Sequence, residues 1–400
     1  MMRGNDRSIQ KIALMMLALN VSAAHAELTI HTDFPGGSAR VQKISQQRQQ
    51  IHIAPTAFNG RGWNCWWYFR VDGANPDQTL ELSVSGMSFA RPDRAVFSTD
   101  RQNWKHTTPA RTTKGTNHYT FKPPADSFWL AWGPPFLIEH AEDLVTRADA
   151  SCDIAEAFTL TRSSDGHDVP ALHIKPDQPT YQLWIQARQH AWESGSSWVC
   201  KGLTDWLIST DSAATALRRR AEIVLVPIMD VDNVQRGAGG KNQFPQDHNR
   251  DWSPTPHWPE VAAAQKWIKK MDMDDQFILF IDLHNPAPND KELFYFLPPA
   301  ELQSKRCLDR QNAFIAQSTI HMSDAPLPFK GLTKVSGRNY DKNWSKISKN
   351  WVAKNTQSPT VAVTLETSWN TPDSTVVNYQ KTGAALGRAI AAFVNTLNEK

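Results

Sequence analysis

Two patterns of hydrophobic and polar positions follow one another along the chain. From Glu27 to about Thr146, short alternating runs are separated by Gly, Pro, Asn and Asp. Strands that are short and recur about every 10–20 residues are typical of an antiparallel β-sandwich. The pattern predicts strands at Gln50–Ile53, Trp66–Val71, Leu80–Val84, Ala95–Ser98, His118–Phe121 and Phe128–Trp132. We expect the tryptophans of this region to pack in its core; they are Trp63, Trp66, Trp67, Trp104, Trp129 and Trp132.

After Ala150 the pattern changes to near-continuous apolar runs that alternate with helical periodicity. The runs predict strands at Tyr181–Ala187, Glu222–Met229, Phe277–Leu283 and Val361–Leu365. Helices are predicted at Ser196–Ile208, Pro259–Met271 and Ser374–Leu397. Strands that are apolar throughout and interleaved with helices indicate an α/β domain with a mixed, mostly parallel sheet flanked by helices. Active sites in such sheets lie beyond the carboxyl ends of the strands.

The first 26 residues read as a secretory signal peptide. Arg3, Arg7 and Lys11 form a basic segment, an apolar stretch follows at residues 12–19, and Ala24-His25-Ala26 is a small-residue cleavage site. The chain is therefore predicted to divide into a signal peptide at 1–26, a β-sandwich domain at 27–147 and an α/β domain at 148–400. We expect the product to be exported, either to the periplasm or to the medium.

Charge and cysteine content narrow the function classes. The formal charge of +3 falls to +1 without residues 1–26, which hold three basic residues and one acidic residue. Such a balance gives no support to nucleic-acid binding, and no later segment has the apolar length of a membrane span. Export permits disulfides among the four cysteines, for which three pairings are possible. The sequence contains no CxxC pair, so we do not expect a zinc knuckle built on cysteines. The cysteines are Cys65, Cys152, Cys200 and Cys307.

Residues suited to chemistry follow three of the predicted strands. His190 and Glu193 come directly after one strand, and their spacing of three lets both side chains reach one ion in a helical turn. His284 ends a second strand. Two histidines and one glutamate leave the fourth position of a tetrahedral zinc open for water, which is the catalytic arrangement. Glu366 ends a third strand, where its free carboxylate could act as a general base.

The segment RQHAWESGSSWVCKG, residues 188–202, resembles the first zinc motif of the zinc metallocarboxypeptidases. It is most similar to the form R-x-H-P-G-E-x-x-x-S-W-x-x-x-G of the cytosolic-carboxypeptidase-like branch. Ala191 and Trp192 replace the Pro and Gly of that form, whereas the ligands are kept. The resemblance implies one zinc ion per chain, held by His190, Glu193 and His284.

Residues 230–250 resemble the second motif of that family, N-P-D-G-V-x-x-G-x-x-R followed by Asn-Arg. The resemblance implies that Asn249 and Arg250 bind the terminal carboxylate of the substrate and that Asp247 orients His190. The family's upstream Arg, which polarises the scissile carbonyl, falls on Gly240. Lys241 stands beside it, and two alternatives stay open: a substitute positive charge or a solvated loop lysine.

The strand VTLETS, residues 363–368, resembles the T-x-E-x-S strand of the branch and implies that Glu366 is the general base. The family also places a Tyr on a mobile loop upstream of this Glu, and Tyr340 is better placed for that role than Tyr295. The segments WYFRV at 67–71, FSTD at 97–100 and AWGPPF at 131–136 resemble the β-sandwich domain of the same branch. The resemblance thus extends over most of the chain.

The resemblance implies zinc-dependent hydrolysis of the C-terminal residue of a peptide. Two alternatives stay open: a zinc amidohydrolase acting on acylated amino acids, and a catalytically impaired protein that binds a peptide or glycan. Lys334, Arg338 and Lys342 lie on the stretch expected to border the pocket and would favour an acidic terminal residue such as Glu or a diaminopimelate-type acid. They could equally be surface charges.

Overall fold

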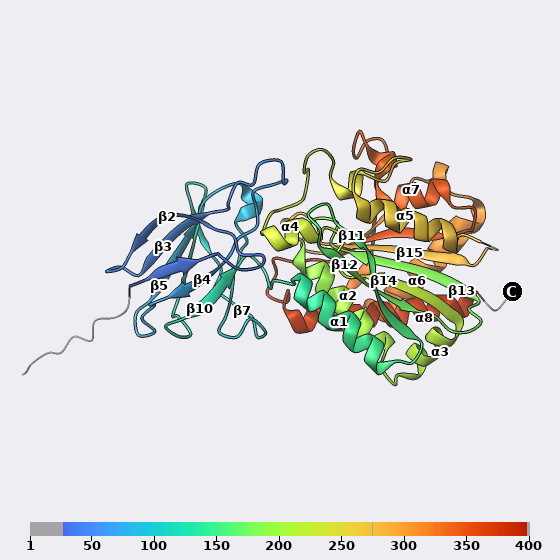
Figure 1. The fold of residues 1–400 in the computed structure, drawn as a ribbon, viewed down its shortest axis with the longest axis horizontal. Helices are drawn as coiled ribbons and strands as arrows, with labels where there is room; N and C mark the ends of the chain where they lie inside the picture. The colour runs from blue at the N-terminus through green and yellow to red at the C-terminus, as the bar shows by residue number, and fades with distance from the viewer. Residues whose placement is uncertain (1–26, 274, 398–400) are drawn as a thin grey trace, which may run out of the picture.

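The computed structural model describes residues 27–273 and 275–397, so the predicted signal peptide lies outside the described residues. Two bodies stand side by side in Figure 1, a domain of strands formed by the first part of the chain and a larger domain of strands and helices. Among the described residues, no helix combines the length and the apolar character needed to cross a bilayer. All four cysteines are free thiols in the structure.

The first domain consists of two five-stranded sheets, in the orders β1-β4-β10-β6-β7 and β2-β3-β5-β9-β8. Alternation along the strands produces the packing: in β5, Leu80, Leu82 and Val84 are buried while the residues between them are partly exposed. Every described pair is antiparallel except β3 with β5, which is parallel. The strands are β1 (Thr29–His31), β2 (Arg40–Ser45), β3 (Gln50–Ala54), β4 (Tyr68–Asp72), β5 (Leu80–Val84), β6 (Val96–Ser98), β7 (Lys105–His106), β8 (Arg111–Thr113), β9 (Thr116–Phe121) and β10 (Phe128–Ala131).

Helix α1 (Ile138–Ser151) links the two domains and packs against strands β11 and β12 of the second. The domain boundary predicted at residues 147 and 148 falls inside this helix. Of the six tryptophans expected in the first core, Trp66, Trp67 and Trp132 are buried, and the other three are only partly buried.

The second domain is built on an eight-stranded mixed sheet in the order β11-β12-β14-β13-β15-β18-β16-β17. Its centre is parallel: β13 pairs in parallel with β14 and β15, and β15 with β18. The antiparallel pairs lie toward the edges. The strands are β11 (Ala155–Arg162), β12 (Asp168–Ile174), β13 (Tyr181–Ala187), β14 (Ala221–Val226), β15 (Phe277–His284), β16 (Leu293–Leu297), β17 (Phe329–Val335) and β18 (Val361–Glu366).

Helices cover both faces of this sheet, with α5 and α7 on one side and α2, α6 and α8 on the other (Figure 1). Burial on both faces explains why β15 and β18 are apolar almost throughout, since every residue in each strand is buried. The expected fold class, a mixed α/β sheet preceded by a β-sandwich, is confirmed. The remaining helices are α2 (Ser194–Leu207), α3 (Ser212–Arg220), α4 (Val231–Arg236), α5 (Pro259–Met271), α6 (Lys305–Met322), α7 (Ser348–Asn355) and α8 (Val376–Thr396).

Candidate active site

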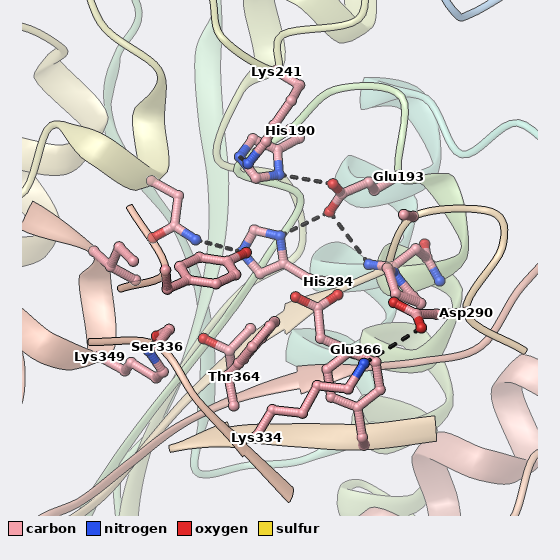
Figure 2. Close-up of a pocket in the computed structure, with 18 of the residues that line it drawn as sticks. His190, Glu193, Lys241, His284, Asp290, Lys334, Ser336, Lys349, Thr364 and Glu366 are labelled. Carbon is pink, nitrogen blue, oxygen red and sulfur yellow. Dashed lines mark hydrogen bonds and ion pairs between the residues drawn. The ribbon is translucent and has the colours of Figure 1, made fainter. Parts of the chain in front are cut away.

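A cavity of about 470 Å³ lies beyond the carboxyl ends of the central strands β13, β15 and β18. It brings together most of the residues singled out in the sequence, which Figure 2 shows converging from several elements. The predicted site residues that line the cavity are His190, Glu193, Lys241, Asn249, Arg250, His284, Lys334, Tyr340 and Glu366.

His190 and Glu193 lie on the short segment that joins β13 to helix α2. The segment is a tight turn rather than the expected helical turn: the backbone N–H of Glu193 donates to the carbonyl of His190 at 3.1 Å, and α2 begins only at Ser194. Arg188 opens the turn with a φ of +65°. Its buried guanidinium donates from Nε to the carbonyl of Ala191, which holds the turn closed.

His284 and Glu366 are placed by strand register. In the parallel pair of β15 and β18, His284 lies directly opposite Glu366. Backbone hydrogen bonds along two fully buried strands therefore set the distance between the third ligand and the proposed base.

His190, Glu193 and His284 form the one cluster of potential metal ligands among the described residues, and one atom of each lies within 4.8 Å of the others. The Nδ1 atoms of both histidines lie 2.7 Å from the oxygens of Glu193. Their Nε2 atoms face carboxylates, Asp247 at 3.1 Å from His190 and Asp282 at 3.0 Å from His284. A carboxylate behind each imidazole fixes its orientation for a metal, so the donor set fits a zinc ion.

The charges of the cluster also suit a cation. Burial alone would raise the pKa of Glu193, but His190 and His284 beside it hold the pKa well below its ordinary value. The carboxylate therefore stays ionised in a buried position, as a metal ligand must be.

Glu366 has a different environment although it lies in the same cavity. It is buried, and its Oε2 has no hydrogen-bond partner among the described residues. Burial, with the carboxylate of Glu193 adding to the effect, raises the pKa of Glu366 to about 7. A carboxyl group with a pKa near neutrality and an unused oxygen can both accept and return a proton.

Asp247, Asn249 and Arg250 lie together on the loop after α4, around a short 3₁₀ helix (His248–Arg250). Asp247 accepts from His190 through one oxygen and from the backbone N–H of Asn242 through the other. The Nδ2 of Asn249 lies 3.2 Å from the Nε2 of His284. Arg250 lines the cavity and donates from Nε to Asp341 and from Nη1 to the carbonyl of Asn249.

Gly240 and Lys241 show why this chain lacks the arginine that the family motif would place here. Gly240 has a φ of +75°, and a Cβ at that position would lie 2.4 Å from Asp230 Oδ2 and 2.8 Å from the backbone nitrogen of Ala191. No side chain fits there without moving the backbone. Lys241 instead extends to the cavity, with its Nζ 3.3 Å from His190 Nε2 and 3.8 Å from Asp247 Oδ2. Lys241 is therefore a cavity lysine, not a solvated one.

The other predicted pocket residues divide into two groups. Tyr340 and Lys334 line the cavity; the ring of Tyr340 packs 5.0 Å from Phe296, and Lys334 lies 3.4 Å from Asp290. Lys342 lines a neighbouring shallow cavity. Arg338 is exposed and stacks on Trp344.

The sequence reasoning did not identify two residues that matter here. Asp282 orients His284, and its signal was an acidic residue inside an otherwise apolar strand. Lys349 lines the cavity although it is fully buried. Its Nζ donates to neutral oxygens, Ser336 Oγ and Asn350 Oδ1, lies 5.9 Å from the centre of the Phe296 ring, and makes no ion pair among the described residues. Burial lowers the pKa of Lys349 to about 7. Nothing in its local sequence distinguishes it from a surface lysine.

Comparison with known proteins places both domains. Residues 30–132 match the family described as cytosolic carboxypeptidase N-terminal domain, and residues 141–255 match the family described as zinc carboxypeptidase. An uncharacterised protein of Zymomonas mobilis is 31% identical over 257 residues, covering 62% of this chain and 66% of that protein. Cytosolic carboxypeptidase 6 of Caenorhabditis elegans is 22% identical over 286 residues, covering 64% of this chain and 62% of that one. The match thus spans slightly less than two thirds of each relative.

A solved structure shares the fold over nearly the whole chain. The metallo-carboxypeptidase from Burkholderia cenocepacia superposes with a TM-score of 0.79 at 21% identity, covering 93% of this chain and all of that one. Both domain families and the shared two-domain fold agree with the geometry of the His-Glu-His cluster. Residues 30–132 are thus similar to the cytosolic carboxypeptidase N-terminal domain, and residues 141–255 are similar to the zinc carboxypeptidase family.

Proposed function

We propose that this protein is a zinc-dependent carboxypeptidase that removes an acidic residue from the C-terminus of peptides outside the cytoplasm. The observation that carries the proposal is the meeting, in one cavity, of the His-Glu-His cluster, an unpartnered Glu366 carboxylate and the guanidinium of Arg250. The location rests on residues 1–26 alone.

His190, Glu193 and His284 would hold the ion. When bound, zinc supplies a Lewis acid that polarises a carbonyl and lowers the pKa of water. Glu366 takes the proton from the attacking water, whose oxygen adds to the scissile carbonyl carbon. As the C–N bond breaks, Glu366 passes that proton to the departing amine. Its pKa of about 7 suits both transfers.

Recognition of the terminal carboxylate falls to the guanidinium of Arg250 and to Asn249, which both line the cavity. Holding that carboxylate beside the cluster confines cleavage to the last peptide bond. Lys241 supports the developing negative charge on the carbonyl oxygen as a point charge, because its ammonium reaches the edge of the His190 ring. Tyr340 lies 6.0 Å from the Arg250 guanidinium, measured to the centre of its ring, and would close over the bound terminus.

Lys349 supports the preference for an acidic residue. Burial without an ion pair disfavours the charged form of Lys349, and an anionic substrate side chain would supply a counter-charge that stabilises the ammonium. The wall of the cavity holds four basic side chains, Lys241, Arg250, Lys334 and Lys349. Figure 2 shows Lys349 and Ser336 together on one side of the cavity, with Lys334 beside Asp290 on another.

The test combines zinc analysis of the purified protein with peptides that differ only in a terminal Glu, Lys, Phe or Ala. We expect about one zinc per chain, release of terminal Glu ahead of the others, and loss of release in Glu366→Gln by about 10²–10⁴-fold. Zinc without release from any peptide would contradict the carboxypeptidase and turn attention to acylated amino acids. Absence of zinc would favour the peptide- or glycan-binding alternative.

The acidic preference has its own test in Lys349→Met. This change removes the charge and keeps the length, so the ratio of kcat/KM for terminal Glu over terminal Phe should fall by about tenfold or more. Lys346→Met is the matched control, because Lys346 is exposed and lies outside the cavity. An unchanged ratio in Lys349→Met would remove the acidic preference while leaving the carboxypeptidase intact.

A further inference from the structure

The sandwich domain reaches the active site through one loop. The loop comprises residues 58–63, between β3 and β4, and we call it the sandwich loop. Its backbone pairs with the catalytic domain at three points: Trp63 donates to the carbonyl of Lys241 at 2.9 Å, Gly240 donates to Arg61 at 2.9 Å, and Phe244 donates to Gly60 at 2.8 Å. Three backbone hydrogen bonds over so few residues hold the two segments together as a short ribbon.

The backbone of the sandwich loop packs directly against the backbone at Gly239–Lys241. Gly62 has a φ of +89°, and a Cβ there would lie 2.5 Å from the carbonyl oxygen of Lys241 and 2.7 Å from the carbonyl carbon of Gly240. Gly239 meets Trp63 in the same way, since its Cβ would lie 2.1 Å from the carbonyl oxygen of Trp63. Glycine on both sides of the contact permits this packing. The sandwich loop is therefore part of the scaffold of Lys241.

Trp63 also lines the cavity directly, and it is the one cavity-lining residue from the sandwich domain among the described residues. Its ring lies 5.0 Å from Phe89 and 6.3 Å from Trp192. Trp192 is fully packed in turn, 5.6 Å from Trp132 and 4.8 Å from Trp369. The ring of Trp63 therefore packs against this aromatic cluster, while Trp63 itself stays partly exposed. A rigid, half-exposed indole at a cavity wall is suited to bind an apolar side chain.

Contacts with the ligand cluster show on which side of the cavity each group lies. Lys241, which carries the Trp63 contact, lies 3.3 Å from His190. On the far side of the ligand cluster, Asn249 lies 3.2 Å from His284 and accepts from the backbone N–H of Ser348, the residue before Lys349. In Figure 2, Lys241 and His190 lie together on one side, and Lys349 and Ser336 lie across the cavity from Lys241. Trp63 and the buried Lys349 thus lie on opposite sides of the ligand cluster.

A substrate in this cavity has a direction. With Arg250 binding the terminal carboxylate and Lys349 the terminal side chain, as proposed above, the rest of the chain would leave past the ligand cluster toward Lys241 and Trp63. We propose that Trp63 forms a subsite for the side chain of the residue that precedes the scissile bond, so that the sandwich domain selects peptides with an apolar or aromatic residue there. The inference rests on the proposed carboxypeptidase function and adds a determinant from outside the catalytic domain.

The experiment uses pairs of acylated peptides that end in Glu and differ only in the preceding residue, Phe or Gly. The zinc-loaded wild type should hydrolyse the Phe peptide with the higher kcat/KM. Trp63→Ala should lower that value by about tenfold for the Phe peptide, mainly through KM, and leave the Gly peptide within about twofold. Calorimetric binding of both peptides to Glu366→Gln, with and without Trp63→Ala, should show the same selective loss in Kd.

The matched control is Trp129→Ala. Trp129 is a partly exposed tryptophan of the same domain that contacts Arg70 and Arg101 and lies outside the cavity. It should leave the Phe-to-Gly ratio unchanged, and melting temperatures should show that both variants are folded. An equal loss for both peptides in Trp63→Ala would overturn the subsite and indicate a structural role. A wild type that neither hydrolyses nor binds either peptide would instead overturn the proposed function, and the inference with it.

Discussion

The residues of the candidate active site lie on two different kinds of structural element. His284 and Glu366 end buried parallel strands, and Glu193 directly precedes the helix that follows a third. Lys241 and Arg250 lie on a long loop outside the sheet. The first set is held by the backbone register of the domain core, whereas the second is held by side-chain hydrogen bonds and by the sandwich loop.

This difference separates two tasks. Metal binding and proton transfer tolerate little positional error, and strand ends supply that accuracy from backbone geometry alone. Substrate recognition can vary between relatives, and a loop can change one residue, as at Gly240 and Lys241, without disturbing the sheet. We call Glu193, His284 and Glu366 the strand-end set, and Lys241 and Arg250 the loop set. We therefore expect changes in the strand-end set to abolish the reaction and changes in the loop set to alter its rate or its substrate binding.

The largest effect should come from the strand-end set. Glu193→Gln removes a charged ligand from between two histidines, so we expect activity to fall by about 10³-fold or more and zinc content to fall with it. Added zinc should raise the melting temperature of the wild type but not of this variant. Glu301→Gln, at an exposed glutamate, is the control for the charge change. Full zinc retention by Glu193→Gln would show that the cluster is not the metal site.

In the loop set, Arg250→Lys should act on binding. A lysine cannot donate to Asp341, the carbonyl of Asn249 and a substrate carboxylate together, so KM should rise by about 10–100-fold while kcat changes less. Arg236→Lys, on the same stretch of chain but paired with Asp165 at the surface, should leave both constants unchanged. A fall in kcat alone would contradict the assignment of Arg250 to substrate binding.

The sandwich loop offers a matched pair of glycines. Gly62 and Gly166 have φ values of +89° and +90°, but only at Gly62 would a Cβ meet the backbone of Lys241, whereas Gly166 faces open space. Both changes to Ala carry a similar backbone strain of about 1 kcal/mol. Only Gly62→Ala should lower kcat/KM, by about tenfold for all peptides. Equal kinetics in the two variants would show that the sandwich loop does not position Lys241.

The smallest effect concerns the stability of the loop. His248 is buried between Asp230 and Glu260. Burial alone would lower its pKa, but these carboxylates, with Asp247 near them, raise the pKa of His248 to about 9. A raised pKa means that the ion pairs stabilise the fold fully below pH of about 6.5, and that this stabilisation is lost as pH rises through about 9.

Urea unfolding of the wild type and His248→Gln at several pH values measures this contribution. The difference in unfolding free energy between the two proteins should be up to about 3 kcal/mol at pH 6 and should shrink toward pH 9.5. A difference that is constant across this range would show that His248 contributes through packing on Trp258 rather than through its charge.

Prediction from sequence succeeded where a local pattern coincides with a tertiary role. The strands β13, β15 and β18 are mostly apolar because they are largely buried on both faces, and polar residues at their ends are therefore conspicuous. Two of the elements that it did not predict bury few residues. Strand β17 is mostly exposed, and helix α6 buries only Gln311, Phe314, Ser318 and Met322, so neither has a strong hydrophobic pattern.

The sequence by itself determined the two-domain order, the α/β sheet and the residues that meet at its strand ends, because hydrophobic periodicity and strand direction are local properties. Only the tertiary structure decided that Lys349 is buried, that Gly240 has no room for a side chain and that Trp63 of the first domain lines the cavity of the second. These facts depend on contacts between segments far apart in the chain, and no local pattern encodes which distant backbone approaches a given residue.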